Sequence, residues 1–108
     1  MKKIIKPWGF EEILEVNKKY MVKRLFMKKN HRCSLQYHKF KLETVICLSG
    51  TLLVKLEKKN IILKQGDTLT IKNKKLHRMQ ALTNRVYYLE CSTPHLDDVI
   101  RVKDDYIR

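Results

Sequence analysis

The sequence predicts an all-β fold, either a sandwich or a barrel. Three observations support this class: the strand-like segments are short, turn signals recur about every 8–12 residues, and the apolar period of a helix is weak along the whole chain. With 108 residues and a hydrophobic content of 44%, the chain has the length and composition of one globular domain with a modest core. We therefore assign residues 1–108 to a single domain.

Eight segments combine apolar and polar alternation with β-branched or aromatic side chains, the pattern typical of strands. In chain order these predicted strands are residues 19–28, 31–38, 43–50, 51–58, 60–64, 68–72, 77–83 and 85–92. The Ser49-Gly50 pair predicts a hairpin between the third and the fourth of them. The tail that follows is the best candidate for a short helix, because Asp97 and Asp98 could cap a helical turn.

The chain is strongly basic, with 24 Lys and Arg residues against 11 Asp and Glu residues and a formal net charge of +13. This charge raises nucleic acid as a partner. It is mostly lysine spread along the chain, however, and no recognition helix, aromatic RNA-binding motif or zinc-finger spacing accompanies it. We therefore expect a solvated lysine-rich surface and no nucleic acid, with part of the charge around a pocket for an anionic substrate.

The sequence carries no signal for a membrane or for secretion. No apolar run approaches the roughly 20 residues that span a bilayer, and the first residues lack the apolar segment and cleavage site of a signal peptide. Cys33, Cys47 and Cys91 are odd in number, far apart and without a CxxC pair, which favours reduced thiols packed as small hydrophobes. The expected compartment is the cytoplasm.

Four polar residues have a spacing that suits a metal site. Gln36 and His38 are two residues apart and so share one face of a strand, while Glu43 follows after a gap in which the chain can turn back to that face. His77 lies on a later predicted strand. Such a set of imidazole and oxygen donors suits Zn, Mn, Fe or Co better than Ca. The alternative is that Gln36 and His38 face solvent on an antiparallel sheet.

The wider spacing favours the metal site. The stretches from Asn30 to Gly50 and from Gly66 to His77 have spacings similar to those of the two cupin motifs. Three segments, KPWGFEEIL near the start, SLQYH in the middle and DDVIRVKDDYIR at the end, resemble the cupin domain of type II mannose-6-phosphate isomerases, and the match is collinear. The resemblance implies an all-β cupin barrel (a double-stranded β-helix or jelly roll) with a short C-terminal helical or irregular tail.

The resemblance also implies the ligands and the cofactor. In this family a glutamine normally stands where other cupins have the first histidine, so the expected metal ligands are Gln36, His38, Glu43 and His77. The expected cofactor is a divalent metal ion, with Zn first and Mn, Co, Fe or Ni as alternatives.

The sequence departs from the family pattern at a few positions. Asn30 replaces a glycine, and Lys72 and Lys74 replace a proline and a glycine, all at turns. Asn tolerates a left-handed backbone, so the turns can differ without moving the ligands. Lys41 stands where many members have arginine, and Ile107 replaces a glycine near the end. The metal site is therefore expected to be intact, and the substrate pocket altered.

The function that the resemblance implies is the interconversion of mannose 6-phosphate and fructose 6-phosphate through an enediol(ate). The expected partners are this sugar phosphate and a second copy of the chain in a homodimer, and the family suggests a role in sugar supply for polysaccharide biosynthesis. The reaction needs a polarised carbonyl, a group that moves a proton between C1 and C2, and cations that hold the phosphate.

Five residues are candidates for these tasks. Glu90 and Lys23 are the candidates for proton transfer, because the alternation of their strands points both toward the barrel interior. An inward Lys23 should face an acid or a ligand, because a buried charge without a partner is costly. Arg32, Lys41 and Arg101 are the candidates for binding the phosphate.

Two other functions remain open from the sequence. One is a non-catalytic or regulatory cupin that binds a sugar, a nucleotide sugar or a metal. The other is a cupin enzyme of a different reaction type, such as an epimerase or an oxygenase. An oxygenase would be expected to use two histidines and one carboxylate with open positions, whereas Gln36 adds an amide. A shared fold cannot separate these alternatives.

Overall fold

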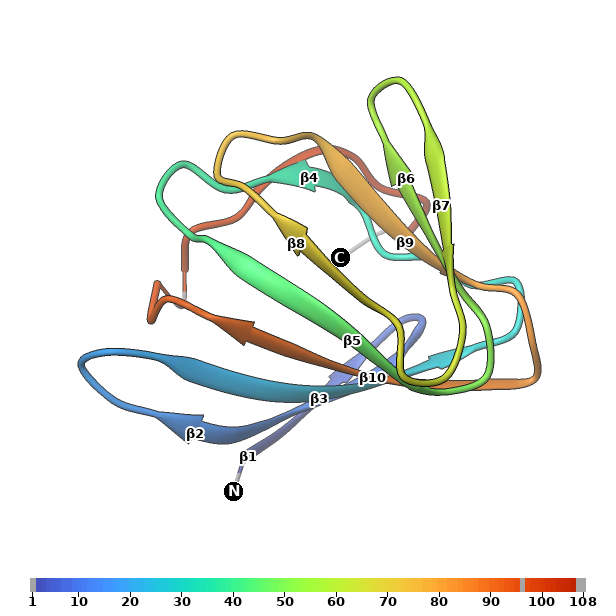
Figure 1. The fold of residues 1–108 in the computed structure, drawn as a ribbon, viewed down its shortest axis with the longest axis horizontal. Helices are drawn as coiled ribbons and strands as arrows, with labels where there is room; N and C mark the ends of the chain where they lie inside the picture. Colours follow the sequence, from blue (N-terminus) through green and yellow to red (C-terminus); the bar gives the residue numbers. More distant parts are fainter. Residues whose placement is uncertain (1, 96, 107–108) are drawn as a thin grey trace.

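The computed structural model describes residues 2–95 and 97–106, and every regular element in these ranges is a β-strand. Two antiparallel sheets face each other across a hydrophobic core (Figure 1). The predicted all-β class is therefore confirmed. Residues 1, 96, 107 and 108 lie outside the described part, and Ile107 of the family-like terminal motif falls there.

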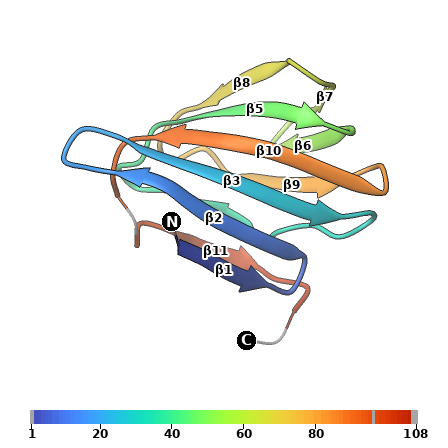
Figure 2. The same cartoon turned by 90° about the horizontal axis from the view of Figure 1, so that it is seen from below.

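The larger sheet has six strands. In spatial order they are β1 (Lys2–Lys6), β2 (Gly9–Val16), β3 (Met21–Lys28), β10 (Arg85–Ser92), β5 (Glu43–Ser49) and β8 (Thr68–Ile71). Figure 2 shows β2, β3, β10 and β5 running side by side across this sheet. In β3 the side chains of Met21, Lys23, Leu25 and Met27 are buried while those between them are more exposed, which is the period-two pattern of a sheet with one face in the core.

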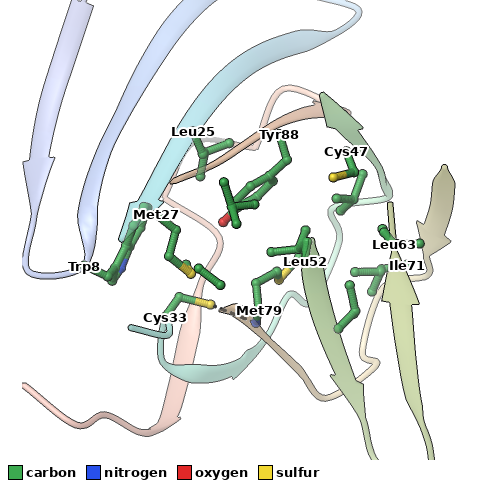
Figure 3. Packing of buried hydrophobic residues seen from close by; sticks show 14 residues of the cluster. Trp8, Leu25, Met27, Cys33, Cys47, Leu52, Leu63, Ile71, Met79 and Tyr88 are labelled. Carbon is green, nitrogen blue, oxygen red and sulfur yellow. Dashed lines mark hydrogen bonds between the residues drawn. The ribbon is translucent and has the colours of Figure 1, made fainter. Parts of the chain in front are cut away.

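The smaller sheet has five strands. In spatial order they are β11 (Ile100–Lys103), β4 (Leu35–Tyr37), β9 (His77–Ala81), β6 (Leu52–Leu56) and β7 (Asn60–Leu63). Figure 3 shows Leu25 and Met27 of the larger sheet packing toward Leu52 and Met79 of the smaller one. Burying apolar surface between two sheets in this way is the main stabilising contribution for a small all-β domain.

The N-terminal 18 residues contain strands that the sequence pattern did not predict. β1 and β2 form an antiparallel hairpin, and β2 also pairs with β3. Their alternation is hidden because neither strand is strongly buried on either face. Trp8, in the turn between them, is almost fully buried and joins the core.

The hairpin predicted at Ser49-Gly50 is wrong. β5 pairs with β8 and β10, whereas β6 pairs with β7 and β9, so this turn carries the chain from one sheet to the other. The hairpin in this part of the chain is instead formed by β6 and β7. Pairing partners far away in the sequence decided the topology, and a local turn signal cannot report them.

The helix expected in the tail is also wrong for the described residues. Residues 100–103 form β11, which pairs antiparallel with β4 and places Ile100 opposite Tyr37 and Arg101 opposite Gln36. The β-branched residues Val99, Ile100 and Val102 favour an extended chain. Asp98 caps a different segment, the loop after β4, as described below.

The turns at the motif positions keep left-handed backbone although glycine is missing from two of them. Asn30 has a φ of 67° and Lys74 a φ of 66°. The expectation that Asn30 adopts this conformation is confirmed. The backbone N–H of Lys74 donates to the carbonyl oxygen of His38 at 2.6 Å, so this turn is bonded to a candidate ligand. Within the described residues there is no helix long and apolar enough to cross a membrane.

Gly50 allows a test of the sheet-to-sheet turn. Its φ is +76°, and an added Cβ would lie 2.4 Å from the carbonyl oxygen of Arg85 and 2.7 Å from Oγ1 of Thr83. Gly66 has a similar φ of +89° but open space around a Cβ, so it provides a matched control. We expect Gly66→Ala to cost about 1 kcal/mol in the free energy of unfolding, from backbone strain alone. Gly50→Ala should cost at least about 2 kcal/mol more, because the turn must also shift.

Urea denaturation of both variants measures the difference. An equal loss for Gly50→Ala and Gly66→Ala would contradict the close approach at Gly50.

Candidate metal centre

Three of the four predicted ligands meet between the two sheets. His38 follows β4, Glu43 is the first residue of β5, and His77 is the first residue of β9. Their exposed fractions are 5%, 2% and 1%, respectively. One potential ligand atom from each lies within 4.8 Å of those of the other two. Strand ends from both sheets thus bring together residues that are up to 39 positions apart in the chain.

The Glu43 carboxylate is the centre of this group. Its Oε1 atom lies 3.2 Å from Nε2 of His38 and 3.2 Å from Nε2 of His77. Burial favours the protonated acid and would raise the pKa of Glu43, but the two imidazoles lower it below its ordinary value. Burial likewise opposes a charge on His77, but the Glu43 carboxylate raises the pKa of this imidazole.

The outer nitrogens of both imidazoles are held by backbone carbonyls. Nδ1 of His38 donates to the carbonyl oxygen of Asp98 at 2.5 Å, and Nδ1 of His77 donates to that of Lys75 at 2.8 Å. A carbonyl can only accept, so both Nδ1 atoms carry a proton and both neutral rings keep a lone pair on Nε2. The partners of Nδ1 therefore aim two Nε2 lone pairs at one carboxylate oxygen.

This arrangement fits a bound cation. Nε2 of His77 is buried and has no hydrogen-bond partner, although the Glu43 oxygen is near. A buried polar atom without a partner is unfavourable, and a positive charge between the Nε2 atoms and the carboxylate, from a proton or from a metal ion, would satisfy this group. Imidazole nitrogen with carboxylate oxygen is the donor set of Zn and other divalent transition metals. His38, Glu43 and His77 could hold such an ion, with backbone carbonyls as the outer shell.

Gln36 lies next to this group. It pairs with His77 across β4 and β9, and its side chain is half-buried. Its Oε1 accepts a hydrogen bond from Oγ of Ser34 at 3.3 Å. Gln36 and His38 line the same cavity, so the amide stands on the side from which a small molecule would approach.

The cavity has a volume of about 110 Å³ and lies between the two sheets. The residues that line it and are either charged or predicted metal ligands are Lys6, Glu11, Lys23, Gln36, His38, Lys41, Glu90 and Arg101. Four of these side chains are Lys or Arg and two are carboxylates. The excess of positive charge favours an anionic ligand.

Lys23 and Glu90 are cross-strand neighbours on β3 and β10 and both line the cavity. The predicted inward orientation of Lys23 is confirmed. The expected partner is an acid, because Nζ of Lys23 lies 3.4 Å from Oε1 of Glu11. Burial, followed by the negative charge of Glu43, raises the pKa of Glu90 to about 8, against the opposing effect of Lys23. Such a carboxyl can hold and release a proton near neutral pH.

The three candidates for phosphate binding are not placed together. Lys41 is buried and lines the cavity, as does Arg101 from β11. Arg32 does not line it, because its guanidinium forms an ion pair with Asp105 of the tail. Arg32 therefore lies outside the candidate substrate site.

Sequence reasoning missed two charged residues of the cavity, Lys6 and Glu11, because the first strands were not predicted. The inward Lys23 was the available signal for an acid such as Glu11. Trp8 both packs in the core and lines the cavity.

Several solved structures share the fold. KdgF from Halomonas sp. superposes with a TM-score of 0.81 at 16% identity, covering 88% of this chain and 89% of that one. A cupin-like protein from Thermotoga maritima gives a TM-score of 0.77 at 19% identity, with 90% and 77% covered. These similarities establish the cupin fold.

Curated relatives also match by sequence. A mannose-1-phosphate guanylyltransferase from Sinorhizobium fredii is 28% identical over 106 residues, which are 94% of this chain and 21% of the relative. The xanthan biosynthesis protein XanB from Xanthomonas campestris is 28% identical over 112 residues, with 99% and 24% covered. The chain thus spans less than a quarter of the length of these relatives.

The family comparison agrees with the motifs, the fold and the ligand group. The family model described as mannose-6-phosphate isomerase C-terminal matches residues 1–104. The chain therefore belongs to the mannose-6-phosphate isomerase C-terminal family of cupins.

Proposed function

We propose that this protein is a metal-dependent sugar-phosphate isomerase that interconverts mannose 6-phosphate and fructose 6-phosphate. The observation that carries the proposal is the buried His38–Glu43–His77 group at a cavity with excess positive charge. Relatives that include a mannose-1-phosphate guanylyltransferase and a xanthan biosynthesis protein support a sugar phosphate as the substrate class. A bound divalent ion would supply a Lewis acid that polarises the carbonyl oxygen of the open-chain sugar.

Glu90 is the group that moves the proton in this proposal. Its carboxylate removes the proton from C2 of the aldose and delivers it to C1, and the hydroxyl proton on O2 passes to O1, so the ketose forms without any net gain or loss of protons. In the metal-free protein the pKa of Glu90 is raised to about 8, which makes this carboxylate a stronger base than an ordinary glutamate. Lys23 lies directly across the strand pair and balances the charge of Glu90 and Glu11.

Lys41 and Arg101 hold the phosphate. Both line the cavity, and they reach it from different segments, the loop after β4 and strand β11. Arginine can bind phosphate oxygens through two parallel hydrogen bonds, whereas lysine acts as a compact charge. Holding the phosphate at a distance from C1 and C2 converts binding energy into orientation of the reacting carbons.

The metal centre can be tested without an activity assay. Glu43→Gln removes the negative charge that the two imidazoles share, so we expect affinity for Zn²⁺ to fall more than about 100-fold, beyond the about 10–100-fold typical of outer-shell changes. Glu57→Gln makes the same chemical change at an exposed position and should leave the affinity unaltered. Calorimetric titration with Zn²⁺ measures the affinity of both variants. Equal Zn²⁺ affinity of the two variants would contradict the metal centre.

The proton-transfer role predicts a separate effect. Glu90→Gln should lower kcat by about 10²–10⁴-fold while metal content stays the same, because the amide cannot accept the proton. A coupled assay of mannose 6-phosphate isomerisation by the Zn²⁺-loaded protein measures this, with Glu57→Gln again as the control. Turnover within tenfold of the wild type would assign the proton transfer elsewhere, and Lys23→Gln is then the next variant.

The same assay separates isomerisation from sugar binding without catalysis. Mannose 6-phosphate that binds to the Zn²⁺-loaded wild type without turnover would favour the non-catalytic cupin.

The raised pKa of Glu90 also predicts a pH dependence of stability in the metal-free protein. Between the ordinary value near 4.5 and about 8, the folded state binds the proton that the unfolded state has released, so the free energy of unfolding falls as pH rises. Glu90→Gln removes this dependence. The stability of the variant relative to the wild type should therefore rise across this range, by up to about 1.4 kcal/mol per pH unit. Urea titrations in chelator from pH 5 to 9 measure it, and a constant difference would contradict the raised pKa.

A further inference from the structure

The strand that leads to His38 has little support from its own sheet. β4 has three residues, and it pairs with β9 at a single position, Gln36 opposite His77. Its other neighbour is β11, from the end of the chain. β4 therefore pairs with its neighbouring strands at too few positions to fix the loop that follows it. That loop carries His38 at its start and Lys41 within it.

Asp98 binds this loop through its side chain. One carboxylate oxygen accepts the backbone N–H of Lys39 at 3.0 Å, and the other accepts those of Phe40 and Lys41 at 2.7 and 2.9 Å. Three successive amides that β-pairing does not satisfy are thus held by one residue. Hydrogen bonds to an ionised carboxylate are stronger than those between neutral groups.

Asp98 also binds the ligand itself, through its backbone. Its carbonyl oxygen accepts the Nδ1 proton of His38, which leaves Nε2 facing Glu43. Two residues later the chain enters β11, which places Arg101 in the cavity wall. One short segment therefore contacts the metal ligand, the loop that bears Lys41, and the strand that bears Arg101.

We propose that Asp98 is a positioning residue that aligns His38 with the metal and Lys41 with the cavity. The inference rests on the metal centre of the proposed function and extends it to a residue about 60 positions away in the sequence. Both carboxylate oxygens are engaged by backbone N–H groups, and Asp98 does not line the cavity, so it does not act as the acid or base. Its contribution is geometric, as for other outer-shell partners of metal-binding imidazoles.

The test compares Asp98→Ala with Asp97→Ala, an exposed neighbour of the same charge. The first readout is Co²⁺ affinity from the visible spectrum, where Asp98→Ala should bind about 10–100-fold more weakly and Asp97→Ala within twofold of the wild type. The second readout is hydrogen exchange at the amides of Lys39, Phe40 and Lys41, which should become at least about tenfold faster in Asp98→Ala alone. Asp98→Asn, which keeps one acceptor oxygen, should restore part of both.

Two outcomes overturn the proposal and can be told apart from failure of the metal centre. If the wild type binds Co²⁺ and Asp98→Ala binds it within twofold, the metal centre stands and the positioning role is wrong. If the wild type binds no Co²⁺, the metal centre fails, and the positioning role is judged by ¹⁵N NMR of His38 in the metal-free protein. If the fraction of His38 in the Nδ1-protonated tautomer is unchanged in Asp98→Ala, the positioning role is wrong. A loss of that tautomer in the variant would support the positioning role.

Discussion

The structure depends on one buried carboxylate. Glu43 lies almost out of contact with solvent, where an isolated charge is strongly unfavourable, and the Nε2 atoms of two imidazoles from the facing sheet lie 3.2 Å from its carboxylate. Because β5 belongs to the larger sheet and β4 and β9 to the smaller one, this contact joins the two sheets at the mouth of the barrel. Backbone carbonyls hold the opposite nitrogens of both rings, so the rings cannot turn away without leaving those carbonyls unpaired. A cation at this point satisfies the carboxylate and both imidazoles at once.

The charge of Glu43 also sets the chemistry of the cavity. After burial, it is the largest influence that raises the pKa of Glu90, while Lys23 and Lys41 oppose the rise. A bound cation would offset the negative charge of Glu43, and the protonation of Glu90 is therefore linked to the occupancy of the metal centre. The ion pair of Lys23 with Glu11 keeps that lysine on the wall of the cavity. The candidate metal site and the raised pKa of Glu90 thus depend on the same buried carboxylate.

Much of the fold was predictable because it follows from local periodicity, and the candidate metal ligands were predictable because their spacing resembles the cupin motifs. Alternation in residues 19–28 and 85–92 indicated strands and the inward faces of Lys23 and Glu90. The paths between strands were not predictable, because the change of sheet at Gly50 and the pairing of β11 with β4 are decided by distant partners. Arg32 shows the same limit: it was a candidate for binding the phosphate, yet Asp105, more than 70 residues later, binds its guanidinium outside the cavity.

The three family-like segments of the sequence meet in space, and this explains why one of them alone would not make the site. Trp8 of the first lines the cavity, His38 of the second stands between it and Glu43, and Arg101 of the third completes its wall. The tail holds the central segment at both ends, through Asp98 on one side and through Asp105 on the other. Since β4 itself is so short, its geometry comes from these contacts more than from sheet pairing. The candidate metal ligands are therefore positioned by residues from both ends of the chain.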